Sequence, residues 1–305
     1  MTRIDAPVEA LPGAGVFIVG CGDIGRRVAR LEQAAGHRVL ALARSETAAS
    51  VLWAQGIEAI PGDLDHPASL HRLPPRAAVL YYFAPPPAEG SGDPRLASLL
   101  TALTPAALPG RIVYISTSAV YGDCQGAWIR EDQPVAPKTD RARRRVAAEQ
   151  TLRDWSQAYG VPWVVLRVPG IYGPGRWPLA WIRQGRPVPR EAECPYSNRI
   201  HADDLAAACF AAARRGRPGQ VYHASDGHPT TLTDYLYRVA DAFDLPRPPA
   251  VALTEFWRTA SPTLRSYLED SKRLDNRRLL QDLGLVLRYP DLASGLAAAR
   301  TAAPG

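Results

Sequence analysis

The 305-residue sequence predicts an α/β fold, with a doubly wound parallel sheet and a smaller C-terminal cap. Short, nearly continuous apolar runs recur through the first half, as is typical of strands buried on both faces of a parallel sheet. Between these runs, apolar residues recur at helical spacing, for example Ile24, Val28 and Leu31. Strand-to-helix crossovers of this length fit right-handed βαβ units.

The predicted elements follow one another along the chain. Six strands are expected at 15–19, 37–43, 57–60, 77–83, 111–115 and 163–168. Prolines then indicate loops, before a helix over 202–215, a strand over 220–224 and a helix over 232–243. The expected organisation is a tail at 1–14, a main domain at 15–172 to which 198–226 return, and a cap formed by 173–197 and 227–305.

Composition excludes several classes of protein. Apolar residues make up 46% and charged residues 22%, which is ordinary for a globular protein and excludes a disordered chain. No apolar run reaches the roughly 18 residues of a membrane span, and the N-terminus lacks the basic region of a signal peptide. The four cysteines form no CxxC pair. We expect a cytoplasmic protein with no membrane partner and no metal site.

The positive charge is carried by arginine. Of 36 basic residues only Lys138 and Lys272 are lysines, so 36 − 2 = 34 are arginines, and the formal net charge is +6. The arginines are scattered, with no basic tail or repeat, so the sequence favours a small anionic ligand over nucleic acid.

A glycine-rich turn carries the strongest local signal. Gly20, Gly22 and Gly25 follow an apolar strand and open an amphipathic helix, with Asp23 and Ile24 in the same turn. This context is the dinucleotide-binding fingerprint of Rossmann folds: the glycines allow the turn, the approach of a diphosphate and close helix–strand packing. The sequence therefore predicts a dinucleotide cofactor.

The end of the second strand bears on which dinucleotide is bound. A carboxylate there accepts a hydrogen bond from the ribose of NAD, but this chain has Arg44 and Ser45. The planar guanidinium of Arg44 suits a 2′-phosphate, with Ser45 adding a hydrogen bond. We predict NADP, with NAD and a merely solvated arginine as alternatives.

Further motifs resemble the extended short-chain dehydrogenases/reductases, the NAD-dependent epimerase/dehydratase group. The similar stretches are 114–122, 167–175, 198–205 and 271–273 with 283–284. The resemblance implies further cofactor contacts from Asp63, Leu64, Phe83, Ala84, Pro85 and Pro169.

The same resemblance exposes a departure at the expected catalytic positions. The family pairs a tyrosine with a lysine four residues later, and here those positions are Arg141 and Arg145. This marks the chain as similar to the atypical members. Arg145 can still hydrogen-bond the cofactor ribose, but it cannot act as an acid near neutral pH. Thr117 matches the family's catalytic hydroxyl. Tyr121 is the first candidate for the missing proton donor and His201 the second.

The resemblance also implies a substrate site and a homodimer, and the arginines at 141–145 suggest a small anionic substrate. The expected substrate-binding residues are Ser118, Tyr121, Arg141, Gly170, Tyr172, Trp177 and Arg199. Gly170 replaces a family asparagine, which argues against the usual sugar-nucleotide substrate. The arginines at 141–145 also fit a solvated helix face. Two functions stay open: an NAD(P)-dependent oxidoreductase or epimerase with a non-standard proton relay, and a catalytically silent NADP-binding sensor or scaffold.

Overall fold

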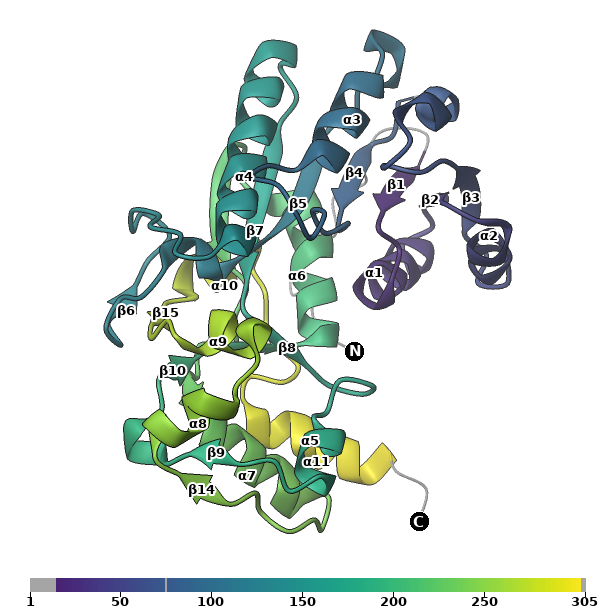
Figure 1. Cartoon of the computed structure of the whole chain (residues 1–305). Coiled ribbons are helices and arrows are strands. Elements are labelled where there is room, and N and C mark those ends of the chain that lie inside the picture. The colour runs from purple at the N-terminus through teal and green to yellow at the C-terminus, as the bar shows by residue number, and fades with distance from the viewer. Residues whose placement is uncertain (1–14, 75, 303–305) are drawn as a thin grey trace.

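A seven-stranded parallel sheet forms the centre of the molecule. The computed structural model describes residues 15–74 and 76–302, so the predicted tail lies outside the described residues. The strand order is β12-β7-β5-β4-β1-β2-β3. The strands are β1 Val16–Val19, β2 Val39–Ala43, β3 Glu58–Pro61, β4 Val79–Tyr82, β5 Ile112–Thr117, β7 Trp163–Val168 and β12 Gln220–His223. The predicted doubly wound parallel sheet is therefore confirmed (Figure 1).

Alternation within the strands builds one apolar core on each face. In β1, Val16 and Ile18 belong to one core, and Phe17 and Val19 to the other, because successive side chains point to opposite faces. The first core lies under α1, α2, α6 and α10, and the second under α3 and α4. These helices are α1 Asp23–Ala34, α2 Glu46–Trp53, α3 Pro94–Ala102, α4 Asp140–Tyr159, α6 Ala202–Arg215 and α10 Arg277–Leu283.

The remaining helices gather beyond one end of the sheet, in the lower part of Figure 1. They are α5 Leu179–Arg183, α7 Leu232–Ala242, α8 Leu253–Thr259, α9 Pro262–Leu268 and α11 Leu292–Ala302. A separate apolar core, which includes Ile182, Leu236 and Leu296, joins α5, α7 and α11. We call α5, α7, α8, α9 and α11 the cap helices.

Short strands connect these parts. They are β6 Trp128–Ile129, β8 Gly170–Tyr172, β9 Val188–Pro189, β10 Tyr196–Ser197, β11 Arg199–His201, β13 Thr230–Thr231, β14 Ala250–Val251 and β15 Arg273–Leu274. β8 pairs with β11, and β6 with β15. Late in the chain, α10 packs on α6 and β12 rather than among the cap helices. The division into domains stays a prediction.

Short 3₁₀ helices complete the connections. They are η1 Pro67–Arg72, η2 Pro105–Ala107, η3 Ser118–Tyr121 and η4 Glu191–Glu193. η3 directly continues β5 and carries Ser118 and Tyr121, whereas Thr117 is the last residue of β5.

Candidate functional site

A cavity of about 1060 Å³ lies along the carboxyl ends of β1 to β4. Open parallel sheets bind ligands at this edge, where the strand order reverses. Twelve of the predicted cofactor-binding residues line the cavity: Gly20, Gly22, Asp23, Ile24, Gly25, Arg44, Ser45, Asp63, Leu64, Phe83, Ala84 and Pro85. We call it the cofactor cavity. The other two predicted contacts, Arg145 and Pro169, lie outside its lining.

The glycine turn has the shape that a dinucleotide needs. Gly20 has φ +89°, and a Cβ there would lie 2.4 Å from the backbone nitrogen of Ala84. A Cβ on Gly22 would meet nothing within 4 Å, so this position faces open space. No side chain caps the first turn of α1, which leaves backbone N–H groups for an anion. The residues present therefore fit a bound diphosphate.

An arginine that sequence reasoning missed reaches the same turn. Arg176, in the segment after β8, lines the cofactor cavity, and its Nε donates to Asp23 at 2.6 Å. Arg27 donates to the other carboxylate oxygen of Asp23 at 2.9 Å. Burial alone would raise the pKa of Asp23, but hydrogen bonds from Arg176 and Arg27 hold this pKa below its ordinary value. The acidic side chain at the helix N-terminus is thus neutralised by two cations.

The part of the cavity lining that follows β2 carries an available guanidinium. Arg44 follows β2 and is exposed, and within residues 15–74 and 76–302 it has no ion pair. The neighbouring carboxylate of Asp65 is instead held by Arg95, at 2.6 and 2.7 Å. Ser45 caps α2, with its hydroxyl accepting from the backbone nitrogen of Ala48 at 3.2 Å. Arg95 also lines the cavity and was not singled out by any motif.

The end of β5 holds the residues predicted to be catalytic. Arg145 donates from Nη1 to the hydroxyl of Tyr114 and to the carbonyl oxygen of Ile115, both at 3.0 Å. Ile115 lines the cofactor cavity, so the guanidinium is anchored beside its wall. Thr117 is half-buried, and its hydroxyl accepts from the backbone nitrogen of Ala119 at 3.3 Å. Ser118, the next residue, is buried.

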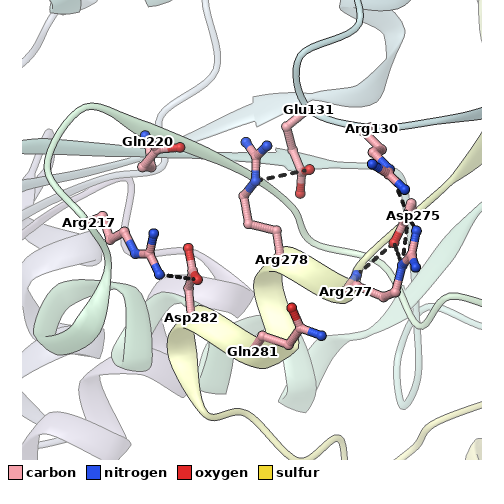
Figure 2. A pocket seen from close by; sticks show the side chains of 9 residues that line it. All are labelled: Arg130, Glu131, Arg217, Gln220, Asp275, Arg277, Arg278, Gln281 and Asp282. Atoms are coloured by element: carbon pink, nitrogen blue, oxygen red, sulfur yellow. Dashed lines mark hydrogen bonds and ion pairs between the residues drawn. The ribbon is translucent and has the colours of Figure 1, made fainter.

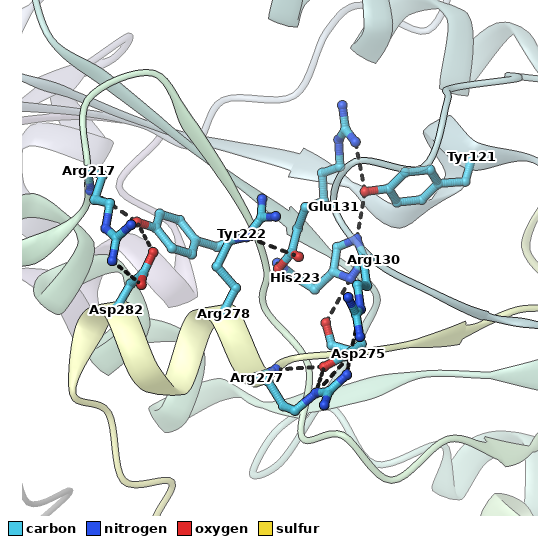
Figure 3. A network of polar contacts seen from close by, with 11 residues as sticks. Tyr121, Arg130, Glu131, Arg217, Tyr222, His223, Asp275, Arg277, Arg278 and Asp282 are labelled. Atoms are coloured by element: carbon cyan, nitrogen blue, oxygen red, sulfur yellow. Dashed lines mark hydrogen bonds and ion pairs between the residues drawn. The ribbon is translucent and has the colours of Figure 1, made fainter.

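Tyr121 lies in a buried polar network outside the cavity lining (Figure 3). Its hydroxyl accepts from Nη1 of Arg167 at 2.7 Å and lies 2.6 Å from Nε2 of His223. Burial lowers the pKa of His223 to about 4, so the ring is neutral. Its Nδ1 lies 3.0 Å from the carbonyl oxygen of Asp275 and donates to it, which leaves Nε2 to accept from Tyr121. Burial also raises the pKa of Tyr121.

An ion pair behind Tyr121 fixes helix α4 to the sheet. Arg167 donates to both carboxylate oxygens of Glu149, at 3.1 and 2.7 Å, and the hydroxyl of Ser116 donates to the same carboxylate. Arg145 lies one turn before Glu149 on α4. The Arg167–Glu149 ion pair therefore also fixes the position from which the Arg145 side chain extends.

Arg141 is covered by a cap helix. Its Nη2 donates to the carbonyl oxygen of Ser266 on α9 at 3.3 Å, and its guanidinium lies 4.1 Å from the ring centre of Tyr267. Its Nε is buried without a hydrogen-bond partner. Nearby, Arg144 is buried and donates to the carbonyl oxygen of Gly90. A fully solvated basic face is therefore the wrong description of 141–145.

The other predicted substrate residues lie towards the cap helices. Tyr172 is buried and donates to the carbonyl oxygen of Asp291, and its ring lies 5.7 Å from that of Trp177. Gly170, on β8, pairs with Arg199 on β11. Arg199 is buried, lies 4.0 Å from the ring centre of Tyr235, and its Nη1 has no hydrogen-bond partner.

His201, the second candidate proton donor, caps a helix. Its Nδ1 accepts from the backbone nitrogen of Asp203 at the start of α6. Burial lowers the pKa of His201 to about 4. In the described parts of the chain, no cluster of residues could hold a metal ion and no helix is long and apolar enough to cross a membrane.

Comparison with known proteins places this site in a family. Residues 16–225 match the model of the NAD dependent epimerase/dehydratase family. A conserved protein of unknown function from Silicibacter pomeroyi is 32% identical, with a TM-score of 0.78 over 94% of this chain and 98% of that chain. The chain therefore belongs to the NAD-dependent epimerase/dehydratase family.

Other similar proteins include two named dehydratases and Protein YeeZ. A dTDP-glucose 4,6-dehydratase of Streptomyces niveus is 34% identical over 134 residues, which cover 41% of this chain and only 39% of that protein. Protein YeeZ of Escherichia coli K12 is 27% identical over 70% of this chain and 73% of its own length. A Streptomyces venezuelae dTDP-glucose 4,6-dehydratase solved with bound NAD shares the fold, with a TM-score of 0.75 over 94% of this chain and 95% of that chain, at 20% identity.

Proposed function

We propose that this protein is an NADP-linked oxidoreductase or epimerase that acts on a small anionic substrate with a non-standard proton relay. The observation that carries the proposal is Arg44, which lines the same cavity as the glycine turn and whose guanidinium has no ion pair among the residues that the structure describes. A phosphate monoester and a guanidinium form two parallel charge-assisted hydrogen bonds, which a free ribose hydroxyl cannot match.

Each part of the cavity has a role in holding the cofactor. The N-terminus of α1 would hold the diphosphate, Arg44 and Ser45 would hold the 2′-phosphate, and Arg145 would donate to the ribose next to the nicotinamide. When bound, the cofactor supplies hydride transfer. The proposed walls around the cofactor are Asp63, Leu64, Phe83, Ala84, Pro85 and Pro169.

The chain's own side chains then orient the substrate and move the proton. Thr117 is the proposed partner of the substrate oxygen, with Arg145 stabilising negative charge nearby. Tyr121 is the proposed proton donor, and Arg167, 2.7 Å from its hydroxyl, would stabilise the phenolate left behind. Ser118, Arg141, Gly170, Tyr172, Trp177 and Arg199 are the proposed substrate-binding residues, with the guanidinium of Arg199 receiving the anionic group.

Cofactor preference can be tested directly by titrating the protein with NADPH and NADH. We expect Arg44→Gln to weaken NADPH binding by about 10- to 100-fold and to leave NADH binding nearly unchanged, because only NADPH carries the 2′-phosphate. The matched control is Arg38→Gln, since Arg38 lies at the opposite end of β2 and pairs with Glu58. A wild-type preference for NADH, or equal losses in both variants, would contradict the proposal.

A catalytically silent sensor remains the second candidate function, because the family's tyrosine and lysine positions hold Arg141 and Arg145. The two functions are separated by following NADPH oxidation with a panel of carbonyl compounds and sugar nucleotides. Turnover that is lost in Thr117→Val, with NADPH affinity retained, supports the enzyme. Tight NADPH binding without turnover across the panel supports the sensor.

The proposal includes a cytoplasmic homodimer. The four cysteines are free thiols, which suits a reducing compartment. Helices α3 and α4 lie together on one face of the sheet, and the resemblance implies pairing of two copies through helices in this place. Light scattering coupled to size exclusion tests this assembly, and a monomer mass at micromolar concentration would exclude it.

A further inference from the structure

A second cavity, of about 440 Å³, lies at the β12 edge of the sheet (Figure 2). Its walls come from the chain after β6, the start of β12 and helix α10. The lining consists of four arginines, three acidic residues and two glutamines: Arg130, Glu131, Arg217, Gln220, Asp275, Arg277, Arg278, Gln281 and Asp282. We call it the arginine pocket. It shares no residue with the cofactor cavity, so the inference drawn from it does not rest on the proposed function.

Two of the four arginines are loosely engaged. Arg130 lies 3.6 Å from a carboxylate oxygen of Asp275, and Arg278 lies 3.5 Å from one of Glu131, beyond normal hydrogen-bond length. By contrast, Arg277 forms hydrogen bonds with Asp275 at 2.9 and 3.0 Å. The guanidinium groups of Arg130 and Arg278 therefore keep donors for an added anion.

The acidic side chains limit what that anion can be. Arg217 pairs with Asp282 at 2.9 Å, and Glu131 is buried, with one oxygen accepting from the backbone nitrogen of His223. Four guanidinium groups against three carboxylates leave one net positive charge on the lining. The carboxylates would repel the backbone of a nucleic acid, but they and the glutamine amides can accept from hydroxyl groups.

We propose that the arginine pocket binds a hexose-sized sugar phosphate, with its phosphate on Arg130 and Arg278 and its hydroxyls on the acidic and amide side chains. Guanidinium forks recognise phosphate through paired hydrogen bonds, and Arg130 and Arg278 are the two loosely engaged forks of the pocket. The volume lies within the range of small-molecule sites. The nearby carboxylates and amides would select a phosphate that carries hydroxyl groups over a bare inorganic ion.

Calorimetric titration of the whole chain tests the proposal, with D-glucose 6-phosphate as the probe and inorganic phosphate and D-glucose for comparison. We expect saturable binding of glucose 6-phosphate that is weakened by at least about tenfold in Arg130→Gln and in Arg278→Gln. Arg247→Gln is the matched control, since Arg247 is an exposed arginine paired with Asp241 outside the pocket. Arg44→Gln tests the cofactor cavity and should leave this binding unchanged.

Other results would contradict a sugar-phosphate site in the arginine pocket. Absence of saturable binding at millimolar concentrations, or equal affinity for inorganic phosphate, would overturn the proposed ligand class. Loss of binding in Arg44→Gln, with retention in Arg278→Gln, would place the phosphate in the cofactor cavity instead. Thermal unfolding of each variant shows that it is folded. Arg130→Gln is the safer substitution, because the Arg130 side chain is 65% exposed and only weakly paired.

Discussion

Individual residues link parts of the chain that are far apart in sequence. Asp23 contacts Arg176 although 153 sequence positions separate them, and Tyr121 contacts His223 although 102 positions separate them. Local motifs predicted the glycine turn and Arg44, because each directly follows the end of a strand, and the family resemblance implied Thr117. Arg176 and His223 were missed since their roles depend on tertiary contacts that carry no local periodicity.

At the residue scale, Arg176 is expected to strengthen cofactor binding. Its guanidinium is the cationic group of the loop after β8 that lies against Asp23 at the diphosphate end of the cavity. Arg176→Gln should weaken NADPH and NADH binding alike, by about tenfold, because both carry the diphosphate. Arg27→Gln removes another partner of Asp23 that lies outside the cavity lining, so equal losses in both variants would refute a direct role for Arg176.

Asp226 provides a pH-dependent prediction. Burial raises the pKa of this carboxyl to about 7, against about 3.9 for an unfolded aspartate. Protonated Asp226 therefore makes its full contribution to the free energy of unfolding below about pH 4. This contribution is lost as pH rises through 7. Asp226→Asn keeps an acceptor for the backbone nitrogen of His228. At pH 8 its free energy of unfolding should exceed that of wild type by a few kcal/mol, because one pKa unit corresponds to about 1.4 kcal/mol.

Urea unfolding of Asp226→Asn and wild type at pH 5 and pH 8 measures this effect. The difference in free energy of unfolding should shrink towards pH 5. A variant that is less stable than wild type at pH 8 would mean that ionised Asp226 stabilises the buried guanidinium of Arg199, which lies in its electrostatic field.

At the scale of elements, long buried strands and amphipathic helices were predictable, whereas two- and three-residue strands were not. The pairing of β6 with β15 depends on which loops come together in the folded chain. A strand of two residues is too short to show an alternating apolar and polar pattern in the sequence. Helix packing adds a further feature that sequence patterns do not show. Arg214 on α6 donates to both oxygens of Glu32 on α1, at 3.0 and 2.8 Å, and Glu32 is fully buried.

Arg214→Met should therefore lower the free energy of unfolding by about 3–5 kcal/mol, because it leaves a buried carboxylate without its cation. Arg247→Met is the control: its side chain is 57% exposed, and such surface pairs contribute about 0–1 kcal/mol. Chemical denaturation monitored by tryptophan fluorescence compares the two. Similar small losses would show that the tyrosine and histidine beside Glu32 suffice to stabilise it.

At the scale of the whole molecule, cofactor binding should be visible as added stability. A ligand that binds only the folded state stabilises it by about 2.7 kcal/mol at one hundred times its dissociation constant. NADPH should raise the melting temperature more than NADH at equal concentration, and Arg44→Gln should remove the difference. Melting curves that do not respond to either nucleotide would exclude the cofactor cavity as a dinucleotide site.

The path of the chain has a consequence for how the protein is made. Edge strand β12 is added to the sheet only after α5 and β8 to β11 have been synthesised, and α10 returns to the sheet after most of the cap helices. During synthesis on a ribosome, the sheet therefore stays incomplete until about three-quarters of the protein has emerged, because β12 ends at His223 of 305 residues, and long-range strand pairing is delayed accordingly. A protease cut in the loop at 245–249 should leave two fragments that stay bound to each other, because each fragment carries part of the first sheet core and part of the core between the cap helices.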